Sequence, residues 1–126
     1  MSFSRNIEDP YIQYLSIKFW LRYLFRRISY FLPPSVIKNF FLMLSGLNIG
    51  KNVFVGDSVK FIDGYQKNKI NLKDNCVISP CCVLIATSYP YKSNLRFNSK
   101  LIQNKEITIE NDVWIGANST ILPGVI

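Results

Sequence analysis

From residue 49 onward, aliphatic residues recur at six-residue spacing, and each is followed four positions later by a small or compact residue. The pairs that fit this template are Ile49/Val53, Val55/Val59, Leu72/Cys76, Ile78/Cys82, Leu84/Ser88, Ile109/Val113, Ile115/Ser119 and Ile121/Val125. A period of six matches neither an α-helix nor an alternating strand. It predicts short strands joined by corners, in turns too small to bury their apolar faces alone. The chain is therefore expected to be mostly β and to fold as a solenoid.

The repeat divides into three turns, 49–66, 72–89 and 109–126, and the inward aliphatic of one turn is expected to stack on its counterpart in the next. An ordinary sheet sandwich is the alternative, but its turns usually recur about every 8–12 residues. The corners contain residues that tolerate a positive φ. These residues are Gly50, Gly56, Gly116, Gly124, Asn52, Asn75 and Asn111.

Residues 1–46 lack the repeat and form a separate N-terminal helical segment, whereas residues 47–126 form the solenoid. From 11 to 32 the sequence is rich in aromatic and aliphatic residues, with Lys18, Arg22 and Arg26 at four-residue spacing. On a helix these three cations fall along one stripe. We therefore predict an amphipathic helix over this stretch.

Pro33 and Pro34 end this helix, because neither has an amide donor and the first also constrains the residue before it. Ser35 is a suitable N-cap for a second helix over 36–44, with Gly46 just beyond its end.

Two roles fit the first helix. It can pack on the solenoid as a cap, or it can lie in the interface of a membrane as a peripheral contact. Four cations between Lys18 and Arg27 argue against a membrane-spanning segment. The sequence leaves both roles open.

Two stretches resemble a known family. VWIGANSTILPGV, residues 113–125, is similar to the penultimate coil of the hexapeptide-repeat acyltransferases, and TSYPYKSNLR, residues 87–96, resembles their projecting loop. Within the family, the chain is most similar to the maltose, galactoside and polysaccharide O-acetyltransferases, over about residues 35–126. The resemblance implies a left-handed parallel β-helix that assembles as a homotrimer. It also implies acetyl-CoA as co-substrate and a sugar or cell-surface polysaccharide precursor as acceptor.

The resemblance also assigns site residues. The loop is expected to project over 89–106, with Tyr89 at the position of the family's catalytic His and Arg96 as a substrate or loop residue. Trp114 matches the Trp beside the active-site cleft, and Ala117 falls where the family contacts coenzyme A. The family pattern continues with at least one further coil beyond Ile126, so the chain is expected to be C-terminally truncated relative to the family.

The chain contains no histidine. A phenol with a pKa of about 10 is only about one part in a thousand ionised at pH 7, and loss of a general base typically lowers the rate about 10²–10⁴-fold. Impaired acetyl transfer is therefore expected, and a non-catalytic binding or structural solenoid is the alternative. Arg96, Lys92 and Lys100 could stabilise a Tyr89 phenolate by folding back on it.

Carboxylates are the other candidate bases in a cleft between subunits. They are Asp57, Asp63, Glu106 and Glu110. Their spacing gives no support for catalysis, and solvated surface charge is the expected role of each.

The net charge and the histidine and cysteine content limit which ligands and partners the chain can bind. The net charge is +7, but there is no Gly-rich phosphate loop and no Lys/Arg run longer than two, which argues against nucleic acid. Without histidine, the three-His zinc site of the β-helical carbonic anhydrases is excluded, and no other metal site is expected. Cys76 and Cys82 occupy compact core positions, and Cys81 is a candidate reactive thiol. Residues 1–8 lack an export signal, so a cytoplasmic location, peripheral to the inner membrane in the second helix role, is expected.

Overall fold

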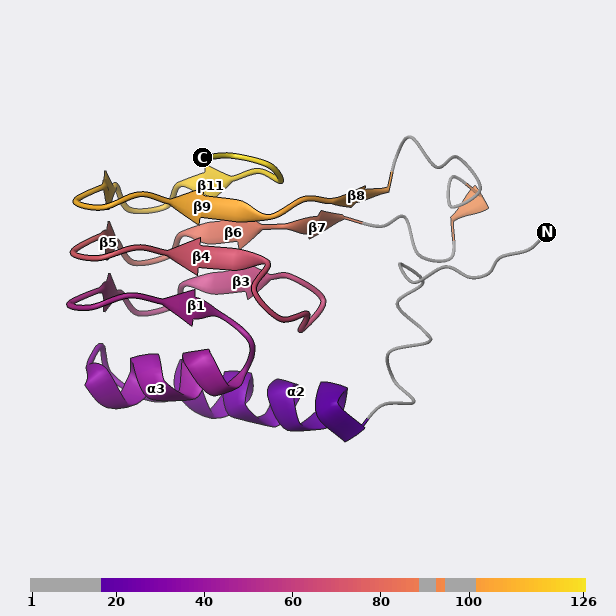
Figure 1. The fold of residues 1–126 in the computed structure, drawn as a ribbon, viewed down its shortest axis with the longest axis horizontal. Helices are drawn as coiled ribbons and strands as arrows, with labels where there is room; N and C mark the ends of the chain where they lie inside the picture. Colours follow the sequence, from indigo (N-terminus) through magenta and orange to yellow (C-terminus); the bar gives the residue numbers. More distant parts are fainter. Residues whose placement is uncertain (1–16, 89–92, 95–101) are drawn as a thin grey trace.

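The computed structural model describes residues 17–88, 93–94 and 102–126, and its strands form three stacked coils of a parallel β-helix (Figure 1). The coils are β1 (Asn48–Ile49), β2 (Phe54–Val55) and β3 (Lys60–Ile62); β4 (Ile70–Leu72), β5 (Val77–Ile78) and β6 (Val83–Ile85); and β9 (Ile107–Ile109), β10 (Trp114–Ile115) and β11 (Thr120–Ile121). Corresponding strands pair into three parallel sheets, β1-β4-β9, β2-β5-β10 and β3-β6-β11. The predicted mostly β fold with an N-terminal helical segment is confirmed.

The strand register shows where the repeat lengthens. Positions that pair between the first and second coils are 23 residues apart in the sequence, as Asn48 and Asn71 are. Positions that pair between the second and third coils are 37 residues apart. In both cases the additional residues enter between the third sheet and the first. At the later of these two places, β7 (Thr87–Ser88) pairs antiparallel with β8 (Gln103–Asn104), so β8 lies within the predicted loop 89–106.

The inward aliphatic positions form the core. Those that are buried are Ile49, Val55, Leu72, Ile78, Leu84, Ile109 and Ile115. Ile121 is only partly buried, because no described strand stacks on the far side of β11. Most compact positions follow the same trend: Val53 and Cys82 are buried and Val125 is 40% exposed, but Ser88 of the second coil is exposed as well. The stacking prediction is therefore confirmed for the first two coils and is incomplete in the third.

Left-handed backbone occurs at the corners, partly at the predicted residues. Asn52 and Asn75 have φ of 57° and 61°, and the Asn52 side-chain amide donates to Asn75 Oδ1 at 3.0 Å. The prediction for Asn111 was wrong, because the next residue, Asp112, takes the positive φ of 63°. The Asn111 side chain instead accepts a hydrogen bond from the amide of Asp74 at 2.9 Å.

Most of the corner glycines do not have a positive φ, and two of them instead allow neighbouring coils to approach each other closely. Gly124 has the predicted positive φ, 84°, but Gly50, Gly56 and Gly116 do not. A Cβ on Gly56 would lie 2.8 Å from the backbone nitrogen of Pro80, and a Cβ on Gly50 would collide with the next coil. Backbone packing between coils therefore requires glycine at these two positions, whereas nothing in the structure explains Gly116.

Both predicted helices are present: α2 (Ile17–Tyr30) and α3 (Val36–Leu44). Residues 11–16 of the first prediction lie outside the described residues. Ser35 caps α3 as predicted, since its Oγ accepts a hydrogen bond from the amide of Lys38 at 3.2 Å, and Gly46 follows the helix with φ of 114°. In the described ranges, no helix combines the length and apolar character needed to cross a membrane.

The two helices form a layer across the end of the β-helix, next to the first coil (Figure 1). Arg26 of α2 is buried and ion-paired with Asp63, just after β3, at 3.0 Å. Lys38 of α3 is also buried, where its Nζ donates to the carbonyl of Gly56 at 3.1 Å, and burial lowers the pKa of this ammonium. The helical segment therefore packs on the solenoid, as in the capping interpretation.

Replacing Ile78 by Ala is expected to lower the free energy of unfolding by about 2–5 kcal/mol, because the fully buried side chain leaves a cavity in the second coil. Ile62 provides a matched control, since it lies on the outer face of β3 and is 43% exposed. Ile62→Ala is expected to cost about 1 kcal/mol or less. Denaturant unfolding followed by circular dichroism measures both variants. Equal losses would contradict the assignment of inward and outward faces.

Candidate functional site

Among the described residues of the β-helix, Trp114 is the most exposed aromatic, with 78% of its surface accessible. It lies on the outer face of β10, where its register partner on β5 is Val77 and the partner of Val77 on β2 is Phe54. The indole Nε1 donates to Ser79 Oγ at 3.0 Å, and Ser79 is buried. This bond orients the ring while leaving it open to a ligand. The role of Ser79 could not be foreseen, because the two residues are 35 positions apart.

Ala117 lies at the corner that follows β10. The corners of the three coils stack there, since the amide of Asn118 donates to the carbonyl of Pro80 and the amide of Cys81 donates to that of Asp57, both at 3.0 Å. Ala117 is exposed, and a Cβ built on its neighbour Gly116 would meet nothing within 4 Å. The backbone at this corner is therefore open to a molecule that approaches from outside.

Tyr89 and Arg96 lie outside the described residues, as do Lys92 and Lys100. The base of their loop is described, because β7 ends at Ser88 and β8 begins at Gln103. Figure 1 places β7 and β8 on the opposite side of the stack from β5, the strand that pairs with β10. Within one chain, the structure therefore does not bring the loop base and Trp114 together.

The predicted carboxylates divide into two environments. Asp57, Glu106 and Glu110 are exposed, and Glu110 lies 3.9 Å from Lys73, consistent with the expected surface role. For Asp63 the prediction of a solvated charge was wrong. It is 1% exposed and binds Arg26 through both carboxylate oxygens, at 3.1 and 3.0 Å. This carboxylate holds the fold together and is not available to a substrate.

The Arg26 guanidinium is the centre of a larger polar cluster. Its Nε donates to Ser45 Oγ at 2.7 Å, and its Nη1 donates to the carbonyl of Phe61 at 2.9 Å. Burial alone would lower the pKa of Arg26, but the charge and hydrogen bonds of Asp63 outweigh burial and raise it. The Arg26 guanidinium therefore stays protonated in its buried position.

The cysteines follow the packing prediction. Cys76 and Cys82 are buried and Cys81 is exposed. Burial raises the pKa of the Cys76 thiol to about 11, which makes it a poor nucleophile at neutral pH. Across the described ranges, no group of three or more His, Cys, Asp or Glu side chains is placed to hold a metal ion.

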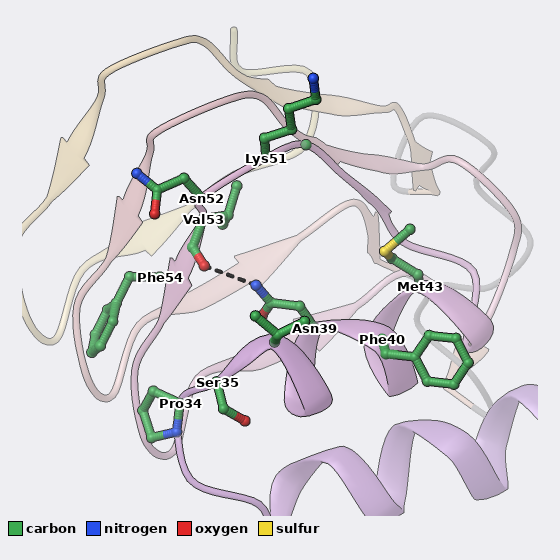
Figure 2. Close-up of a pocket in the computed structure, with 11 residues that line it drawn as sticks. Pro34, Ser35, Asn39, Phe40, Met43, Lys51, Asn52, Val53 and Phe54 are labelled. Atoms are coloured by element: carbon green, nitrogen blue, oxygen red, sulfur yellow. Dashed lines mark hydrogen bonds between the residues drawn. The ribbon is translucent and has the colours of Figure 1, made fainter.

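An open groove of about 560 Å³ lies between α3 and the first corner of the β-helix (Figure 2). Phe40 and Met43 line the helix side, and the segment from Gly50 to Phe54 lines the other. Asn39 ties the walls together, since its Nδ2 donates to the carbonyl of Val53 at 2.8 Å (Figure 2). Trp114 and Ala117, the two predicted site residues that the structure describes, do not line this groove.

Comparison with known proteins gives a partial match. No protein-family model matches the chain. Galactoside O-acetyltransferase of Escherichia coli K12 is 35% identical over 81 residues, which cover 64% of this chain and 38% of that protein. The chain resembles the hexapeptide-repeat O-acetyltransferases. A Dictyostelium discoideum protein, whose name assigns it only provisionally to the acetyltransferases, is 32% identical over 79 residues, or 63% of this chain and 40% of that protein.

The chain spans about two fifths of the length of these curated relatives. Its parallel sheets agree with the β-helix of the hexapeptide-repeat acyltransferases, so the resemblance found in the sequence is confirmed. The roles of Tyr89, Arg96, Trp114 and Ala117 remain predictions.

Proposed function

We propose that this chain is part of an acetyl-CoA-dependent O-acetyltransferase that acts on a sugar or a cell-surface polysaccharide precursor. The observation that carries the proposal is the 35% identity to galactoside O-acetyltransferase over 81 residues, on a chain folded as a parallel β-helix. In this reaction a sugar hydroxyl attacks the thioester carbonyl and loses its proton to a base. The C–S bond then breaks, and coenzyme A leaves as the thiol or thiolate.

Each predicted site residue has a role in this proposal. Tyr89 takes the position of the base, and the exposed ring of Trp114 offers an apolar surface to the C–H face of a sugar. Arg96 is a cation of the loop that would contact the substrate. The open corner at Ala117 suits the family's coenzyme A contact, because the small side chain leaves the backbone accessible.

The placement of the loop base supports a homotrimer. β7 and β8 lie across the stack from the sheet that carries Trp114 (Figure 1). Because the loop base and Trp114 lie on different sides of the stack, we infer that the site forms between two copies of the chain, with the loop of one reaching the neighbouring β10.

A non-catalytic β-helix is the second candidate. It is favoured by the absence of histidine from the whole sequence, because imidazole is the usual base near neutral pH. In this case the chain would bind a sugar or coenzyme A without transferring the acetyl group.

Trp114→Ala is expected to reduce kcat/KM for acetyl transfer to a galactoside acceptor by about tenfold or more, because the acceptor loses its apolar platform. Phe54→Ala is the matched control, since Phe54 is an exposed aromatic on the same sheet, two strands away. We expect this control to change kcat/KM by less than about twofold. Release of free thiol from acetyl-CoA and mass spectrometry of the acceptor measure the reaction.

Equal effects of the two substitutions would contradict the role of Trp114. No transfer by a folded protein that binds coenzyme A would instead support the non-catalytic candidate.

A further inference from the structure

The helical layer has its polar side chains on the inside. Arg26 and Ser29 of α2 and Lys38 of α3 are buried against the β-helix. Large apolar residues lie on the opposite side of each helix, away from the β-helix. They include Ile17, Trp20, Leu21 and Leu24 of α2, and Ile37 and Phe40 of α3, which together we call the apolar end face.

The apolar end face is continuous across both helices. α2 and α3 pack together through Phe25 and Phe41, whose ring centroids are 6.2 Å apart. Because Arg26 and Lys38 both point into the β-helix, the exposed sides of the two helices point in the same direction, outward along the stack. Ile17, Ile37 and Phe40 are between 55% and 74% exposed. A contiguous apolar surface of this kind usually marks an interaction site.

The two described helices carry charge of one sign. Neither α2 nor α3 contains Asp or Glu, whereas α2 carries Lys18, Arg22, Arg26 and Arg27. Arg26 is buried against Asp63, and Lys18 and Arg27 are exposed at the borders of the face. The guanidinium of Arg27 lies over the ring of Tyr23, 5.1 Å from its centroid. The surroundings of the face are therefore cationic as well as aromatic.

We propose that the apolar end face docks on an anionic membrane surface. The apolar side chains enter the boundary between headgroups and acyl chains, Trp20 lies at headgroup level, and Lys18 and Arg27 contact lipid phosphates. The described part of α2 has 14 residues, fewer than the roughly 20 needed to cross a bilayer, and in this proposal both helices lie in the plane of the surface. The β-helix then stands upright on the membrane, with its third coil farthest away (Figure 1).

The positive charge of the helices favours an anionic lipid surface, and not a second copy of the chain, as the partner that binds the apolar end face. Two copies joined through this face would form a self-complementary contact, in which Lys18 and Arg27 face the same cations and no carboxylate of α2 or α3. An anionic lipid surface instead supplies phosphate groups that complement both residues.

Vesicle flotation of the full chain tests the proposal. We expect the protein to float with phosphatidylglycerol vesicles and to bind phosphatidylcholine vesicles at least about tenfold more weakly. Raising the ionic strength from about 0.1 M to about 1 M shortens the screening length from about 10 Å to about 3 Å and should release part of the bound protein.

Two matched leucine variants locate the contact. Leu24→Glu is expected to reduce the partition coefficient about tenfold or more, because it places a carboxylate in the apolar end face. Leu122→Glu is the control, since Leu122 lies beyond β11 at the other end of the stack and has a similar exposure, 58% against 52% for Leu24. We expect Leu122→Glu to bind like the unmodified chain, and thermal unfolding by circular dichroism confirms that both variants are folded.

Arg27→Gln gives an independent readout if Leu24→Glu does not fold. Arg27 is fully exposed, so the variant should fold and bind anionic vesicles with reduced salt sensitivity. Equal binding to both lipids, no flotation, or equal loss in the two leucine variants would overturn the proposal. A dimer in sedimentation velocity that Leu24→Glu dissociates, without vesicle binding, would assign the face to a second copy and would also overturn it.

Discussion

Asp63→Asn is expected to lower the free energy of unfolding by about 3–5 kcal/mol, because it leaves the Arg26 guanidinium buried without a counter-charge. Both side chains are essentially inaccessible to solvent, and Asp63 also accepts a hydrogen bond from the amide of Tyr65 at 3.0 Å. Denaturant unfolding measures the change. A loss of this size would show that one ion pair joins the helical layer to the β-helix.

Asp112→Asn is the control, since Asp112 is exposed at a corner of the third coil and its φ of 63° is one that Asn also adopts. Its effect is expected to stay within about 0.5 kcal/mol. Replacing both partners, with Arg26→Met and Asp63→Leu, should cost much less than the sum of the single changes, because no charge is then left buried alone. A loss in Asp63→Asn no greater than in Asp112→Asn would contradict the buried pair.

Tyr89→His is expected to raise kcat/KM for acetyl transfer by about 10²-fold or more, provided that the lack of a base limits the reaction. An imidazole with a pKa near 6.5 is largely unprotonated at pH 7.5, whereas a phenol with a pKa near 10 is almost fully protonated. The rate is measured in a folded protein with demonstrated affinity for coenzyme A.

The pH profile distinguishes the two bases. A general base acts in its deprotonated form, so the activity of Tyr89→His should rise as the pH passes about 6.5 and then level off. Any activity of the unmodified chain should keep rising towards about pH 10. Tyr89→Phe, which removes only the hydroxyl, controls for the change of ring. If Tyr89→His gave no gain, Tyr89 would not be the catalytic position.

The six-residue period predicted the β-helix because every coil needs an apolar side chain at the same inward-facing positions, and this requirement repeats along the sequence. Ile78 and Leu84 have to be apolar for the same reason, and the same spacing reveals both. The period does not report how coils approach each other. Gly56 was therefore assigned to a positive φ, when its actual role is to let the backbone of Pro80 come close.

The sequence placed Arg26 correctly on a helical stripe with Lys18 and Arg22, but it could not show which way the stripe faces. The partner of Arg26 is Asp63, 37 residues further on, and such a distant pair has no local pattern. The hydrogen bond from Trp114 to Ser79 is of the same kind, because its two partners are 35 residues apart.

The unequal steps of 23 and 37 residues between paired strands have a consequence for chain design. All the added length is accommodated at one edge of the triangular prism, while corners such as that of Asp57, Pro80 and Asn118 keep a constant length and hydrogen-bond directly to one another. Lengthening a loop adds little closure entropy, because this cost grows only with the logarithm of the loop length. That edge is therefore the natural place to graft a foreign recognition peptide. The exposed turn at Lys67 is a suitable insertion point. The binding specificity of a peptide inserted there could be changed without rebuilding the core.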